Sequence, residues 1–247
     1  MLFEAVRQQL DSLATAELRP VEVAVVDSGI DASHPDLKGK VVAAYRAEQG
    51  EGRVAVREVP LGTNNDTFGH GTGVASIIAR IAPNARLVDL RVLGAQHSAG
   101  GLLLEGMRSA VARRCPVINM SLAATANMAH SLFGMCELAY RQGQVVVASK
   151  RNMPLVDNGF PAEFSSCIGV DSSRLSSEFH VRYRSGDPIE FVAHGEEVLV
   201  AAPGGGYTTK TGTSFATPAV SAMCALLLGA WPELRPFEIK TLLKWSI

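Results

Sequence analysis

The chain has 247 residues, of which 47% are hydrophobic, so it is long and apolar enough to bury a substantial core as one large domain. Its 23 Lys and Arg residues nearly balance its 24 Asp and Glu residues. A nearly neutral chain gives no electrostatic reason to expect nucleic acid or an anionic membrane as a partner. The longest apolar runs look too short to span a bilayer, so we expect a single domain over residues 1–247 and no membrane span.

The N-terminus and the cysteines bear on where the chain works. Residues 1–4, MLFE, lack the basic start and the apolar run of a signal peptide. The cysteines lie far apart without CxxC spacing, mostly among apolar residues, which predicts buried free thiols in a reducing compartment. We therefore expect a cytoplasmic protein, although a chain from which a signal had been removed would look the same. The four cysteines are Cys115, Cys136, Cys167 and Cys224.

The first third of the chain contains two helix patterns and at least three strand patterns. Apolar residues at helical spacing predict an amphipathic helix over residues 2–17, within an N-terminal segment 1–19. The apolar run VEVAVVD, residues 21–27, predicts a strand that ends in a carboxylate. Two β-prone runs around a glycine-rich turn predict a hairpin over residues 41–59. A helical pattern then covers residues 70–81 before the next strand.

The middle of the chain alternates more regularly. Helices are predicted at 101–114 and 128–142, and strands at 116–121 and 144–149. Strands separated by helices of this length imply a parallel sheet covered on both faces. In residues 164–200 the strands shorten, and the runs HVRYR and IEFV alternate in polarity like an exposed antiparallel edge. The fold class is therefore α/β, with a mainly parallel central sheet and helices on both faces.

The most informative stretch is GTSFATPAVSAMCALLLGAW, residues 212–231, where a glycine turn leads to Ser214 at the start of a long apolar helix. We expect Thr213 or Ser214 to cap this helix. Unpaired N–H groups and the positive end of the helix dipole stabilise negative charge that develops beside the hydroxyl, as acyl transfer requires. The segment alone also fits a plain capping serine before a core helix.

Two further stretches favour catalysis. A serine hydroxyl is a weak nucleophile until a base takes its proton, and the base needs a partner that fixes its tautomer. Asp27 ends an apolar strand, and His70 follows a glycine and opens an apolar helix. Each residue alone has an ordinary structural explanation, as a turn cap or as a histidine at a helix start. Together with Ser214 they supply carboxylate, imidazole and hydroxyl in that chain order.

The segments VAVVDSGID, HGTGVAS and GTSFATPAV resemble, in order, the three catalytic blocks of the subtilisin-like serine proteases, the subtilases. The resemblance spans roughly residues 20–245. It implies the three-layer subtilisin-like fold and peptide hydrolysis through an acyl-enzyme. It also implies a triad of Asp27, His70 and Ser214, no cofactor, and a peptide or protein as substrate.

The sequence departs from the family around the oxyanion site. Subtilases generally continue after the matching strand with small residues, Gly and then Asn, whereas this chain has Ser149-Lys150-Arg151-Asn152. The resemblance assigns Asn152 the oxyanion role, with Asn158 as the fallback. If Arg151 must take a backbone conformation that only glycine adopts cheaply, the loop would be misplaced.

The resemblance also indicates a cleft in which a peptide lies as an added strand between two chain segments. Gly159 would form part of the pocket floor, and Ala123 replaces a usual glycine and narrows the pocket wall. Arg151 pointing into the pocket would reject Lys and Arg and pair with Asp or Glu, whereas Arg151 in solvent would leave an apolar pocket. The expected substrate-binding residues are Ser98, Ala99, Gly100, Ser121, Leu122, Ala123, Arg151 and Gly159.

Two other family features are expected to be missing. Subtilases usually begin with a folded propeptide, for which there is no room here, so a regulatory or folding partner could replace it. The loop that binds calcium in secreted relatives is absent after the helix at 70–81, so we expect no metal. Three functions stay open: an intracellular endopeptidase of restricted specificity, a catalytically silent binding or regulatory module, and an esterase or acyl transferase.

Overall fold

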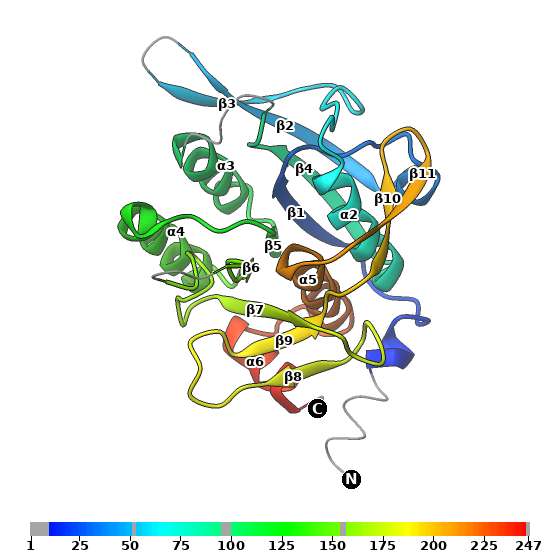
Figure 1. Ribbon diagram of the computed structural model, residues 1–247, viewed down its shortest axis with the longest axis vertical. Coiled ribbons are helices and arrows are strands. Elements are labelled where there is room, and N and C mark those ends of the chain that lie inside the picture. The colour runs from blue at the N-terminus through cyan, green and yellow to red at the C-terminus, as the bar shows by residue number, and fades with distance from the viewer. Residues whose placement is uncertain (1–9, 51–52, 95–99, 154–156, 246–247) are drawn as a thin grey trace.

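The structure is a computed structural model that describes residues 10–50, 53–94, 100–153 and 157–245. The described part forms a nine-stranded sheet in the order β3-β2-β4-β1-β5-β6-β7-β9-β8 and a two-stranded sheet of β10 and β11 (Figure 1). In the large sheet, all neighbouring strands from β2 to β9 pair in parallel, and β3 and β8 pair antiparallel at its two edges. The expected mainly parallel sheet is confirmed.

The strands are β1 (Val21–Asp27), β2 (Val41–Gln49), β3 (Val54–Glu58), β4 (Ala85–Arg91), β5 (Val117–Met120), β6 (Val145–Ser149), β7 (Ile168–Ser173), β8 (Val181–Tyr183), β9 (Phe191–His194), β10 (Val198–Ala202) and β11 (Gly206–Lys210). The helices are α2 (His70–Ile81), α3 (Gly100–Ala112), α4 (Ala129–Arg141), α5 (Thr213–Ala230) and α6 (Pro236–Trp245), with short 3-10 turns at Pro35–Leu37 and Ala126–Met128.

Side chains of β1 show how the sheet separates two cores. Val23 and Val25 point into one core, which α2, α5 and α6 cover. Ala24 and Val26 point into the other, which α3 and α4 cover. Successive side chains of a strand leave opposite faces, so a strand that is apolar throughout must be covered on both sides. The three-layer arrangement expected from the sequence is the result, with α3 and α4 on one side of the sheet in Figure 1.

Most of the predicted elements are confirmed, and two differ in detail. The hairpin over residues 41–59 forms as β2 and β3. The helix expected over 2–17 is helical at residues 10–13 and ends there, and residues 1–9 lie outside the described part. β8 is an antiparallel edge as expected, but β9 is an inner strand that pairs in parallel with β7. β9 is inner because Phe191 and the next two residues are buried within the sheet.

The carboxyl ends of the central strands define the functional end of the sheet. β4 and β5 follow each other in the chain but pair with opposite sides of β1, so the strand order reverses there. Open parallel sheets bind ligands outside the carboxyl ends of strands at such a reversal. Asp27 ends β1, Ser121 follows β5, and Ser149 ends β6, so all three lie at this end.

Helix α5 contradicts one expectation from the sequence. Among the described residues, its 18 residues are long and apolar enough to cross a membrane by length and composition, although the apolar runs looked too short for that. In the structure 89% of this stretch is buried inside the protein, packed against α2 and the sheet. A core helix of a three-layer domain is surrounded by apolar neighbours, which explains why it is hydrophobic on all sides.

Candidate active site

Asp27 and His70 meet at the carboxyl end of β1. The Nδ1 atom of His70 lies 2.7 Å from Oδ1 of Asp27, and the Ser28 N–H donates to the same oxygen at 2.7 Å. Asp27 is fully buried, and the His70 side chain is 26% exposed. A buried carboxylate bonded to one ring nitrogen fixes the tautomer and leaves Nε2 to act as a base. The structure thus brings together two of the three predicted triad residues.

A second carboxylate, Asp66, holds this pair in place and was missed by the sequence reasoning. Its Oδ1 accepts from the Ser28 hydroxyl at 2.8 Å and from the Gly69 N–H at 2.9 Å. Its Oδ2 accepts from the N–H and the hydroxyl of Thr72, in the first turn of α2, at 2.8 and 2.6 Å. Asp66 therefore joins the residue after Asp27 to both sides of His70. An acidic residue four positions before the histidine was the available signal, since carboxylates cap helix starts.

Opposing influences act on the pKa of His70, and the net effect raises it above the usual 6.5. Burial lowers the pKa, because a cation is disfavoured away from water, and the positive charge of Lys210 lowers it slightly. The negative charge of Asp27, its hydrogen bond to the ring, and the charge of Asp66 together outweigh these effects. The ring of Phe215 packs against the imidazole of His70, with the two ring centroids 5.3 Å apart.

Ser214 lies in the first turn of α5, on a helix start that differs from the expectation. The residue before the helix is Gly212, at φ 151°, and no side chain caps the helix, so the prediction that Thr213 or Ser214 caps it is wrong. The Thr213 hydroxyl instead donates to the carbonyl of Lys150 at 2.6 Å. Ser214 itself is half-buried.

Two hydrogen bonds connect Ser214 to Ser121. The Ser214 hydroxyl donates to the Ser121 carbonyl at 3.0 Å, and the Ser121 hydroxyl donates to the Ser214 carbonyl at 2.9 Å. The second bond is possible because Pro218 stands four residues after Ser214 and has no N–H to offer that carbonyl. Within the described residues Ser214 and His70 share no hydrogen bond. Such catalytic bonds often form only once substrate is bound, so this does not argue against the triad.

Asn152 lies beside the start of α5, next to the predicted nucleophile Ser214, as the oxyanion assignment requires. Its Oδ1 accepts from the Thr213 N–H at 3.0 Å and lies 3.1 Å from the Thr213 hydroxyl oxygen, whose proton goes to the closer Lys150 carbonyl. A Cβ placed on Gly212 would stand 3.3 Å from the same oxygen, which shows how closely the two segments approach. With its oxygen directed at the helix start, the amide NH2 is left to donate to another group. Asn158, the fallback, donates its own N–H to Glu163 and forms part of a turn.

The two cations before Asn152 are accommodated without the misplacement considered above. Among the described residues, only Arg114 and Glu197 have positive φ without being glycine, so Arg151 has an ordinary backbone conformation. The Lys150 ammonium lies 2.9 Å from Oδ2 of Asp171. The Arg151 guanidinium lies 3.0 Å from Oδ1 of Asp157. Both cations are paired with carboxylates.

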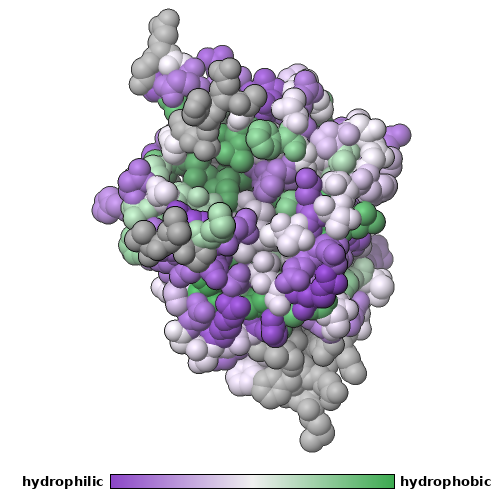
Figure 2. Space-filling model, in the orientation of Figure 1, coloured by the Kyte–Doolittle hydropathy of each residue, from purple (hydrophilic) through white to green (hydrophobic). Residues whose placement is uncertain are grey.

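A depression of about 370 Å³ lies next to the expected peptide-binding segments. Leu122 and Ala123 line one side, and Gly100 at the start of α3 lines the other. Figure 2 shows hydrophobic side chains gathered near α3 on this face. Ser98 and Ala99 lie outside the described residues. Gly159 has φ 93°, a conformation that suits glycine, and it lies against Ala123 and Arg151. Leu93, Leu103, Ala124, Thr125, Asn127 and Met128 complete the lining of the depression.

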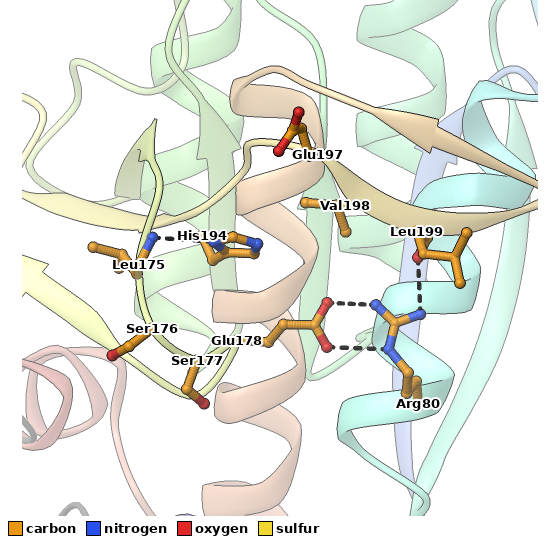
Figure 3. Close-up of a pocket in the computed structure, with 9 residues that line it drawn as sticks. All are labelled: Arg80, Leu175, Ser176, Ser177, Glu178, His194, Glu197, Val198 and Leu199. Carbon is orange, nitrogen blue, oxygen red and sulfur yellow. Dashed lines mark hydrogen bonds and ion pairs between the residues drawn. The ribbon is translucent and has the colours of Figure 1, made fainter.

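A second depression of about 360 Å³ lies elsewhere, between the end of α2 and β10 (Figure 3). Arg80 lines it and is bonded to Glu178 and to the Leu199 carbonyl, and His194 accepts from the Leu175 N–H. None of its lining residues is a predicted site residue. These contacts tie α2 to the strands beside it.

The described residues offer no group of three or more His, Cys, Asp or Glu side chains that could hold a metal ion. The Asp31 carboxylate, a conceivable metal ligand, already accepts hydrogen bonds from the N–H and hydroxyl of Ser33 and from the Gly204 N–H. The four cysteines are free and buried, as predicted.

A buried carboxylate, an imidazole bonded to it, and a serine at the start of a helix beside a side-chain amide define a serine hydrolase site at the end of a parallel sheet. Comparison with known proteins assigns the chain more closely. The chain belongs to the subtilase family, whose model matches residues 19–247, and it is a subtilisin-like serine peptidase.

Relatives of known name agree with this assignment. The chain is 31% identical over 223 residues to the major intracellular serine protease of Bacillus subtilis, and the match covers 84% of this chain and 68% of that protein. It is also 31% identical to subtilisin E of the same species, with 89% of this chain and 58% of that protein covered. Against an intracellular serine protease of Paenibacillus polymyxa, identity is 31%, with 85% and 67% covered.

Solved structures support the fold. A cold-adapted subtilisin-like serine proteinase is 26% identical, with a TM-score of 0.73 and 92% of this chain and 81% of that chain covered. The S41 psychrophilic protease has a TM-score of 0.77 at 23% identity, with 95% and 87% covered, and this likeness concerns the fold alone.

Proposed function

We propose that this protein is an endopeptidase that cuts peptide bonds through an acyl-enzyme formed on Ser214. The observation that carries the proposal is the 2.7 Å bond between Asp27 and His70 at the same end of the sheet as Ser214. A carboxylate that orients an imidazole next to a helix-borne serine supplies general-base activation and a place for the oxyanion.

The reaction follows from these roles. His70 takes the proton of Ser214 as its oxygen attacks the peptide carbonyl, and Asp27 stabilises the imidazolium that forms. The Asn152 amide and the Ser214 N–H hold the negatively charged oxygen. His70 then gives the proton to the leaving amine, and water repeats the steps to release the acyl group. Every step uses side chains and the backbone of the chain itself.

We further propose that the protein works in the cytoplasm on a restricted set of proteins or precursor peptides. Two relatives are named intracellular serine proteases, and all four cysteines are free and buried, as suits a reducing compartment. A regulatory or folding partner in place of a propeptide stays a prediction.

The test is covalent labelling with a fluorophosphonate, which reacts with an activated serine. The wild type should be labelled and should cleave an unfolded protein, and Ser214→Ala should abolish both while the melting temperature changes little. Ser221→Ala is the matched control, because Ser221 lies on the same helix but is buried and bonded to Asn119. A folded wild type that is neither labelled nor active would instead favour the silent binding module.

A further inference from the structure

The space beside the nucleophile that should receive a substrate side chain has three walls. Ser121 contacts Ser214 and begins the first wall, residues 121–124. An antiparallel bridge joins Ala124 to Phe160, so residues 158–160 form a second wall next to the first. Asn152 and the two residues before it form the third, since Asn152 contacts the start of α5. The side chain that precedes the scissile bond must enter between these segments when its carbonyl meets Ser214 and Asn152.

Arg151 crosses this space. Its backbone N–H donates to the Asn158 carbonyl at 2.6 Å, so the side chain starts at the junction of two walls. Its Nη2 donates to the Ala124 carbonyl at 3.1 Å and lies 3.0 Å from Oδ1 of Asp157. The Arg151 side chain is 29% exposed and that of Asp157 is 16% exposed, so the pair is largely withdrawn from water.

Ala123 narrows the same space. A Cβ built on Gly159 would stand 2.7 Å from the Cβ of Ala123 and 3.4 Å from the Cβ of Arg151. A separation of 2.7 Å is shorter than two carbon atoms tolerate, so even a methyl group has no room at this point of the floor. Ala123 and Arg151 thus fill the floor from two sides.

The charge of Arg151 is already balanced. Because Arg151 is paired with Asp157, an acidic substrate side chain would have to displace the Asp157 carboxylate. That carboxylate belongs to the same chain, so its pairing does not cost the translational and rotational freedom that a substrate loses on binding. The acidic-substrate interpretation drawn from the sequence is therefore weaker than a purely steric one. Swinging the arginine into solvent would break its bonds to Ala124 and Asp157 and leave the Asp157 carboxylate without its cation.

We infer that Arg151, anchored by Asp157 and Ala124, blocks the pocket beside Ser214, so that the enzyme cleaves after residues no larger than glycine or alanine. This inference rests on the proposed peptidase function and adds a substrate class to it. A bulky side chain before the scissile bond would collide with the arginine and hold its carbonyl away from Ser214.

The experiment compares wild type with Arg151→Gly and Arg151→Ala on a peptide library varied at the residue before the scissile bond. A single methylene group in an apolar pocket changes kcat/KM by about 10–200-fold, so kcat/KM for Ala should exceed that for the much larger Phe or Leu by at least about 100-fold in the wild type. Both variants should recover most of that factor for Phe and Leu and change little for Ala. Asp157→Asn, which removes the anchor, should give a partial recovery. Arg174→Ala is the matched control, since Arg174 is an exposed arginine paired with Glu197.

A second readout does not need turnover. Diphenyl phosphonates that carry an Ala-like or a Phe-like side chain phosphonylate the serine directly, with phenoxide as the leaving group, and the wild type should react selectively with the first. Wild-type preference for bulky apolar residues, unaltered in Arg151→Gly, would overturn the inference, and so would a preference for Asp or Glu that the substitution abolishes. A wild type that reacts with no phosphonate, including the unselective fluorophosphonate, would overturn the proposed function itself.

Discussion

The side of the site around Asp27 and His70 and the side around Lys150 to Gly159 are held in place by different interactions. On the first side, Asp27 and Asp66 are buried and accept hydrogen bonds from backbone and hydroxyl groups of α2 and of the segment between β1 and α2. On the second side, Lys150 forms an ion pair with Asp171, and Arg151 forms one with Asp157. All four side chains keep some exposure to solvent.

This difference in how the two sides are held suggests that the first side governs the rate of the reaction and the second side governs substrate selectivity. Buried hydrogen bonds to carboxylates are strong and resist salt, and leaving one unpaired is costly. These two ion pairs keep part of their surface in water, so salt screens them more than it screens the buried hydrogen bonds. Substitutions on the first side should therefore reduce turnover for all substrates, whereas those on the pocket side should change which substrates are used.

After the complete loss expected for Ser214→Ala, the largest effect is expected for Asp27→Asn. An amide at this position cannot stabilise the imidazolium and favours the wrong tautomer, so kcat should fall by about 10⁴-fold, the size known for serine proteases that lose this carboxylate. Steady-state kinetics on one good peptide measures it. Asp36→Asn, which removes an exposed carboxylate bonded to Tyr207, is the control. A loss that is equal in both variants would contradict the special role of Asp27.

Asn152 lies on the boundary between the two sides. Its replacement by alanine should lower turnover and leave substrate selectivity unchanged. Removing one oxyanion donor lowers kcat by roughly 10²–10³-fold in subtilisin, and we transfer that range without deriving it. The loss should be the same for every substrate and should appear in kcat more than in KM. An unchanged rate would assign the oxyanion to another donor, with Asn158→Ala as the next variant to measure.

The pH dependence tests the electrostatics of the first side. The base works only when neutral, and the pKa of His70 is raised above 6.5 by Asp27 and Asp66 despite burial. Activity should therefore fall as pH drops through a value above 6.5, by about tenfold per pH unit below it.

Asp66→Asn sharpens this test, because it removes a negative charge while keeping the shape of the side chain and one acceptor oxygen, for the donors on either the Ser28 side or the Thr72 side. The charge of Asp66 raises the pKa of His70, so removing that charge should lower this pKa. The acid limb of the kcat/KM profile should therefore move to lower pH. A loss of activity without movement of the acid limb would leave Asp66 with only a structural part.

The smallest effect is expected from a chelator. A ligand that binds only the folded state adds to stability, so removing a bound calcium would lower the melting temperature. Helix α2 runs from His70 to Ile81 as one element, without the loop in which secreted relatives hold calcium. EDTA should leave the melting temperature unchanged. A fall of several degrees that calcium reverses would reveal a site, and Asp31 and Asp36 would be the first residues to replace.

The sequence by itself determined the elements and the chemistry-bearing residues. The apolar run of β1, the helix that starts at His70, and the glycine turn before Ser214 are local patterns, so they could be interpreted one segment at a time. The placement of Asp27 at a strand end followed from the same pattern. The resemblance of three blocks to the subtilases then assigned their roles, and the family match over residues 19–247 agrees with it.

The tertiary structure decided which distant groups meet. Asp66 bonds to Ser28 across 38 residues, Ser214 bonds to Ser121 across 93, and Arg151 reaches Ala124 across 27. Whether Arg151 entered the pocket or solvent could not be predicted, because the answer depends on a carbonyl and a carboxylate that only the folded chain brings within reach. Local periodicity fixes where a segment forms helix or strand, whereas side-chain direction is fixed by packing between segments that are distant in the sequence.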